Sequence, residues 1–348
     1  MISRKVKTSI AQEMEKSGLE ARYDNNAKEL IAHKIILAHI LVATMEEYKG
    51  LDPKDVIPLI EGDPQVFRES KARRKKNKTK FLGKTRAAVK TEPKITGMST
   101  VLAESGNGNI EQDIRFYVWT PDRSELNEKS VKILSNVEIQ NKYNPGYNIA
   151  NRQVFGACRM VSNQKDREFT ESNYDDLKKV TSIWIFTNPN KEGRLTISMY
   201  KFRQFNICGS NPDKSNLYDK INIINIGLAK DTEEDIRTAP GIIKLLGTLF
   251  SKNMPVEVRK EILEQDFGIP MQEDVEERMS EMCNLSQDIK YEALREGRRE
   301  GRREGRREER VALIRLLLLR GDSEESIIEL GFTENDIKKA KKIINKNV

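Results

Sequence analysis

The spacing of apolar residues divides the first half of the chain into one helical segment and two strand-like segments. Between residues 26 and 47, apolar side chains recur at the spacing of one helix face, and Gly50 follows as a helix end. Residues 112–120 and 132–140 instead alternate apolar with polar side chains, which is typical of half-buried strands. On the second strand one face is apolar, and the opposite face carries Glu138 and Gln140.

The second half continues with a helix and more strands before it becomes helical. The turn Asn144-Pro145-Gly146 precedes a helix predicted over 148–160. Strands are predicted over 180–187, 194–202 and 220–227, and helices over 241–249, 256–265 and 274–284. Strands, a helix and further strands indicate the α/β class, with a mixed sheet flanked by helices and an all-helical C-terminal extension.

The extension carries a four-residue repeat, EGRREGRREGRREE, at residues 296–309. Glu–Arg pairs three residues apart favour a helix, whereas the glycine of each repeat weakens it. We expect a long, exposed, charged spacer helix, with DNA binding by its arginines as the alternative. Beyond it, Ser323 and Thr333 are predicted helix caps around Gly331. The two short helices so defined form a small core, an oligomer contact or a DNA-reading unit.

Charge is concentrated in one part of the chain. The 348 residues carry a net charge of +7, but residues 68–90 hold eleven Lys or Arg and one acid, which leaves the remainder at −3. Such a block, with Arg73, Arg74, Lys75 and Lys76 at its centre, is typical of a protein that binds a polyanion such as DNA. A solvated loop that only keeps the protein soluble is the alternative.

Several classes of protein are excluded or disfavoured by composition. No stretch approaches the roughly 18 apolar residues of a membrane span, and the N-terminus lacks the apolar segment of a secretory signal. The three scattered cysteines fit a reducing cytoplasm and offer no zinc spacing. The two histidines, His33 and His39, lie in one short segment, so a histidine metal site cannot be assembled from distant parts of the chain. Any catalysis must therefore rest on carboxylates, Lys, Arg, Tyr or amides.

The strongest candidate chemistry lies on the two strand-like segments 112–120 and 132–140. Asp113 begins the first strand, and Glu138 and Gln140 share a face of the second. If the strands form a hairpin, Asp113 lies beside them, and two neighbouring carboxylates bind Mg²⁺ well because a hard cation prefers oxygen ligands. Taken alone the pattern is weak, since solvent-facing polar residues would look the same.

Several stretches of the chain resemble one family, the PD-(D/E)XK nuclease family transposases, bacterial relatives of the Rpn-like recombination-promoting nucleases. The resemblance covers roughly residues 26–309 and is densest over 94–188. The stretches that carry it are NAKELIAHKIILAHIL, KITGMST, DIRFYVWTPD, KILSNVEIQNKYNPGYNIANRQVFGACRMVSNQ, DDLKKVTSIWIF, MCNLS and EGRREGRREGRREE.

The resemblance implies roles for individual residues. Asp113 corresponds to the metal-binding Asp of the family motif, and Glu138 corresponds to its (D/E) position. Gln140 stands where the motif has Lys, and a neutral amide can position water but cannot offset phosphate charge. The resemblance also suggests Glu29, on the first helix, as an additional metal ligand, although the helix dipole alone favours an acid there.

The helix that follows Gln140 provides the candidate DNA contacts of the core. Arg152 and Arg159 lie seven residues apart, and the resemblance places this helix beside the metal site. Arg152 could hold a phosphate bidentately, with structural ion pairing as the alternative. The domain limits expected are a flexible N-terminus at 1–25, a nuclease-like domain at 26–270 with an exposed basic loop at 68–94, a charged helical segment at 271–310 and a small helical unit at 311–348.

Together these observations predict a cytoplasmic, metal-dependent DNA endonuclease with a restriction-endonuclease-like core. Mg²⁺ or Mn²⁺ is the expected cofactor, DNA and a second copy of the chain are the expected partners, and we expect neither a small-molecule cofactor nor a membrane. The alternative is a DNA-binding or interaction protein on a nuclease fold with weak or no turnover.

Overall fold

The computed structural model describes residues 9–66, 101–104, 108–122, 130–141, 145–210, 214–270 and 273–344. The chain divides into two compact units. One unit comprises residues 17–286, and the other comprises residues 287–348 together with residues 1–16. The boundary between residues 286 and 287 lies inside a long helix, α9 (Glu273–Arg320).

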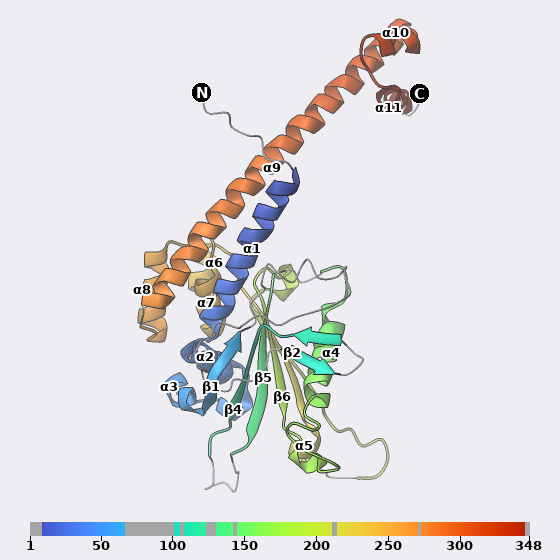
Figure 1. Cartoon of the computed structure of the whole chain (residues 1–348). Helices are drawn as coiled ribbons and strands as arrows, with labels where there is room; N and C mark the ends of the chain where they lie inside the picture. The colour runs from blue at the N-terminus through green and yellow to red at the C-terminus, as the bar shows by residue number, and fades with distance from the viewer. Residues whose placement is uncertain are drawn as a thin grey trace, which may run out of the picture. The chain divides into compact units, whose positions relative to one another are not determined.

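A six-stranded mixed sheet forms the centre of residues 17–286 (Figure 1). Its strand order is β1-β4-β5-β6-β8-β7. The strands are β1 (Ile60–Val66), β4 (Ile114–Trp119), β5 (Lys132–Gln140), β6 (Val180–Phe186), β8 (Ile221–Gly227) and β7 (Thr196–Lys201). β4 pairs antiparallel with β1 and β5, whereas β5, β6 and β8 are parallel and β7 is antiparallel to β8. A separate ladder joins β2 (Val101–Glu104) to β3 (Gly108–Glu111).

Helices cover both faces of this sheet. One face contributes alternate apolar residues to the largest buried cluster, together with α2 (Lys34–Thr44), α7 (Gly241–Phe250) and α8 (Val256–Phe267). Against the other face, α4 (Ile149–Ser162) packs Ile149 and Ala157 onto Trp184 and Phe186 of β6. Figure 1 shows α4 on the opposite side of the sheet from α2 and α7. The connections include the short helices α3 (Pro53–Val56), α5 (Ser215–Tyr218) and α6 (Glu233–Thr238).

The N-terminal region differs from the sequence prediction. Residues 9–25, expected to be flexible, lie in α1 (Ser9–Ile31), and the Tyr23 hydroxyl donates a 2.8 Å hydrogen bond to the carbonyl of Phe250. The single helix predicted over 26–47 is interrupted between α1 and α2, where His33 has an extended backbone (φ −62°, ψ 127°). Ile31 and Ile36 are buried on either side of the break, so the apolar pattern continues through it.

The C-terminal helices follow the prediction more closely. The helices predicted over 274–284 and 296–309 are parts of one helix, α9, which is followed by α10 (Glu324–Glu329) and α11 (Glu334–Ile344). The hydroxyls of Ser323 and Thr333 accept hydrogen bonds from the N–H groups of Ser326 and Asp336, as expected of helix caps. A small core holds this end together; its buried members are Val311, Ile314, Ile327, Ile337 and Ala340.

Candidate functional site

The β4–β5 hairpin brings the two predicted carboxylates together. Ile114 pairs with Val137, so the antiparallel register continued by one residue places Asp113 opposite Glu138. The backbone N–H of Ile139 donates a 2.9 Å hydrogen bond to Asp113 Oδ2, and the Glu138 carboxylate accepts from the backbone N–H of Asp113. Each carboxylate is therefore held by the other strand, and the antiparallel pairing on which the sequence argument depended is present.

Alternation along β5 decides which face carries the site. Val137 points into the large core, whereas Leu134 packs with Met160 of α4. Glu138 and Gln140 share the parity of Leu134 and therefore lie on the α4 face of the sheet. The predicted alternation of this strand is confirmed, but β5 is buried on both faces and is not half-buried, because Leu134, Asn136 and Glu138 on the α4 face are buried as well.

Glu138 is buried, with a relative exposure of 6 %. Burial and, to a lesser extent, the negative charge of Asp113 raise the pKa of its carboxyl group to about 8, against the opposing positive charge of Arg152. The Asn136 amide donates a 3.0 Å hydrogen bond to Glu138 Oε1 and favours the ionised form. A buried acid beside a second acid is destabilised when ionised, which is why Glu138 keeps its proton to a higher pH than an exposed glutamate.

Arg152 approaches this pair from α4. Its guanidinium lies 5.3 Å from the ring centroid of Trp184, and Trp184 is the β6 residue in register with Glu138. The same guanidinium donates a 3.2 Å hydrogen bond to the Tyr147 hydroxyl, and the residue is exposed. Arg159 differs, because it is buried with 6 % relative exposure, so the structure separates it from the exposed surface that Arg152 occupies.

Lys28 of α1 is the site residue that sequence reasoning missed. Its ammonium lies 2.9 Å from Asp113 Oδ1 and 2.6 Å from Asp24 Oδ2, and its side chain is almost fully buried. Burial by itself lowers the pKa of Lys28, but the charges of Asp113 and Asp24 outweigh it and raise that pKa above its ordinary value. The Asp24–Lys28 spacing is visible in the sequence as an i,i+4 pair, but nothing there links Lys28 to Asp113.

Glu29 does not join the site as the sequence suggested. Its carboxylate forms an ion pair with Arg278 of α9. Neighbouring helix positions point about 100° apart, so when Lys28 faces Asp113 the adjacent Glu29 faces elsewhere. Within the described residues, no group of three or more His, Cys, Asp or Glu side chains is placed to hold a metal ion.

Two protein carboxylates nevertheless suit a hydrated hard cation. Mg²⁺ is commonly held by one or two carboxylates while water and substrate phosphate complete its shell. In this structure Asp113 Oδ1 contacts the Lys28 ammonium and Oδ2 accepts a hydrogen bond from the Ile139 N–H, so a cation held by the Asp113–Glu138 pair would compete with Lys28 for Asp113. Gln140 lies two residues beyond Glu138 on the same strand face, and its backbone carbonyl accepts a 3.1 Å hydrogen bond from the N–H of Thr187.

The basic block of residues 68–90 lies outside the described part of the chain. The role of Arg73, Arg74, Lys75 and Lys76 therefore stays a prediction. Comparison with protein-family models, curated proteins and solved structures finds no match to this chain. None of the helices described combines the length and the apolar character needed to cross a bilayer.

Proposed function

We propose that this chain is a metal-dependent DNA endonuclease with a restriction-endonuclease-like core. The observation that carries the proposal is the Asp113–Glu138 pair, which lies across the β4–β5 hairpin with Glu138 buried and its pKa raised to about 8. A buried carboxyl group whose pKa is strongly raised beside a second carboxylate is typical of functional sites. An antiparallel hairpin that continues into parallel strands, with helices on both faces, is compatible with the proposed fold family.

Each residue of the site has a proposed role. Asp113 and Glu138 would hold Mg²⁺ or Mn²⁺, and Gln140 would orient water. When bound, the ion would lower the pKa of its water and neutralise phosphodiester charge. Arg152, exposed beside Trp184, would hold a phosphate of the DNA backbone, and the block at residues 68–90 would add sequence-independent contacts.

Lys28 supplies the positive charge that Gln140 lacks. Its buried ammonium contacts both Asp113 and Asp24, so its charge would act on the site through Asp113 and not by direct contact with the substrate. A cytoplasmic homodimer, in which each copy cuts one strand of a duplex, completes the proposal.

The same contact supports a second candidate function, DNA binding without hydrolysis. Lys28 already neutralises Asp113 in this structure, and an ammonium at that place can stand in for a metal ion. With Gln140 in place of lysine, such a site would bind DNA but would not cleave it.

Plasmid nicking separates the two candidates. Purified wild-type protein is expected to nick supercoiled DNA with Mg²⁺ and to stop when a chelator is added, and Glu138→Ala is expected to be inactive. Glu168→Ala is the matched control, because Glu168 is an ion-paired carboxylate whose partner is Lys178. Undiminished DNA binding with no nicking at any Mg²⁺ or Mn²⁺ concentration would support the second candidate and refute the first.

A further inference from the structure

The repeat in α9 sorts its charges into columns along the helix. Because the repeat is four residues long, each arginine lies one turn above another arginine, and each glutamate lies one turn above another glutamate. Two adjacent columns are arginine: 295, 299, 303 and 307, and 298, 302, 306 and 310. The glutamates 296, 300, 304 and 308 form a third column beside them.

This arrangement is a poor one for a helix that serves only as a spacer. Like charges at i,i+4 destabilise a helix, whereas pairs of glutamate and a basic residue at i,i+3 or i,i+4 stabilise it by similar amounts. Within residues 295–310, every i,i+4 pair in which both residues are charged carries the same sign. Glu–Arg pairs at i,i+3 offset part of this repulsion, and Gly297, Gly301 and Gly305 weaken the helix further.

The arginine columns are exposed and border a hollow on the helix surface. A space of 520 Å³ is lined by Tyr291, Leu294 and six of the arginines. We call these six residues the arginine stripe, and all of them are exposed: Arg295, Arg298, Arg299, Arg302, Arg303 and Arg306. A charge pattern that is unfavourable in the free helix and open to solvent fits a surface that binds a negatively charged partner.

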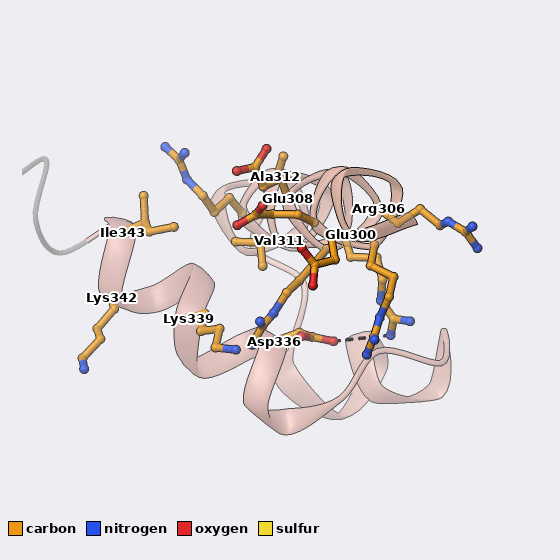
Figure 2. A pocket seen from close by; sticks show the side chains of 14 residues that line it. Glu300, Arg306, Glu308, Val311, Ala312, Asp336, Lys339, Lys342 and Ile343 are labelled. Atoms are coloured by element: carbon orange, nitrogen blue, oxygen red, sulfur yellow. Dashed lines mark ion pairs between the residues drawn. The ribbon is translucent and has the colours of Figure 1, made fainter. Parts of the chain in front are cut away.

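A second hollow continues from the end of the stripe. It measures 1310 Å³, lies between α9 and α11, and shares Arg303 and Arg306 with the first. Figure 2 shows Lys339 and Lys342 on the α11 side of this hollow. Arg310 forms an ion pair with Asp336 of α11 at 3.4 Å. We therefore do not include Arg310 in the arginine stripe.

We propose that the arginine stripe binds the phosphate backbone of duplex nucleic acid. From residue 295 to residue 306 the helix rises about 16 Å, which matches about five base pairs of a duplex. The repeat itself contains no aromatic residue on which unpaired bases could stack, and Tyr291 lies at one end of the stripe, which favours a duplex over a single strand. The inference stands whether or not the Asp113 site hydrolyses DNA.

The test measures binding of the full chain to a short DNA duplex at several salt concentrations, with a chelator present so that cleavage plays no part. Arg299→Gln with Arg303→Gln removes two phosphate contacts, so the slope of log K against log salt is expected to fall by about 1.8. Arg299→Lys with Arg303→Lys keeps both charges and is expected to keep the slope.

A charge-exchanged variant provides the matched control for net charge. It carries Arg299→Glu, Glu300→Arg, Arg303→Glu and Glu304→Arg, so its composition is unchanged while the stripe is broken. We expect its slope to fall at least as far as that of the glutamine variant, with the helix content measured by circular dichroism for each protein. Unchanged slopes in both variants would overturn the proposal, and a change from dimer to monomer with unchanged slopes would assign the stripe instead to a contact between copies of the chain.

Discussion

Replacing Glu138 by glutamine removes the ionised form of a carboxyl group that is disfavoured by burial and by the negative charge of Asp113. Glutamine has nearly the same shape and can still accept the hydrogen bond from Asn136. The folded chain raises the pKa of Glu138 from 4.5 to about 8, so between these values the folded state holds a proton that the unfolded chain releases. The stability that Glu138 contributes is therefore fully present below pH 4.5 and is lost as pH rises towards 8.

The size of this effect follows from the two pKa values. Each pKa unit corresponds to about 1.36 kcal/mol, so the full loss is on the order of 5 kcal/mol above pH 8, of which about 3 kcal/mol is lost by pH 7. Because Glu138→Gln has no such proton to lose, it is expected to be more stable than the wild type by an amount that grows with pH.

Urea unfolding at about pH 5, 7 and 8.5, in the presence of a chelator, measures this difference. The two tryptophans, Trp119 on β4 and Trp184 on β6, report on the sheet alone when unfolding is followed by fluorescence. Glu168→Gln is the control and is expected to lose the Lys178 ion pair without gaining stability at high pH. If Glu138→Gln differs from the wild type by the same amount at every pH, burial and repulsion do not raise the pKa of Glu138.

Three further predictions concern the surroundings of the site and the division of the chain. Lys28→Met removes a buried ion-pair partner and is expected to cost about 3 kcal/mol in chelator, and Mg²⁺ should raise the thermal unfolding temperature of this variant more than that of the wild type. Arg152→Gln removes a charge that lowers the pKa of Glu138, so the midpoint of the pH profile of cleavage should move to higher pH. Deletion of residues 290–348 is expected to leave the fluorescence-monitored unfolding of the sheet unchanged, whereas deletion from residue 271 onward should destabilise it because the buried Met279 and Met282 are lost from the core.

Strong periodicity explains why most of the sheet could be predicted. The segments predicted over 132–140, 180–187 and 220–227 correspond to β5, β6 and β8, because alternating or continuous apolar residues carry the signal of a half-buried or buried strand. β1 has no such signal, since Gly62, Asp63 and Pro64 interrupt it and its pairing shifts register between Glu61 and Gln65. β1 lies at the edge of the sheet because it pairs with β4. The amino-acid pattern of β1 alone gives no sign of that pairing.

The residues of the site also divide into those with a local sequence signal and those that only tertiary packing brings together. The sequence placed Asp113 beside Glu138 only on the condition that the two consecutive strands pair, and the register that sets them opposite each other comes from the structure. The contact between Lys28 and Asp113 joins distant parts of the chain and depends on how α1 packs, which no spacing in the sequence reveals. Packing also determines the difference in exposure between Arg152 and Arg159. Both lie on α4, but only Arg159 is buried.

The most direct test of the central claim is the rate of Mg²⁺-dependent plasmid cleavage by purified Asp113→Asn. The substitution removes one negative charge from a site that is proposed to need both carboxylates, and it leaves the side-chain volume almost unchanged. We predict a rate several orders of magnitude below that of the wild type, with DNA binding in chelator equal or stronger because a carboxylate no longer repels phosphate. Cleavage by Asp113→Asn at the wild-type rate would contradict the assignment of this site.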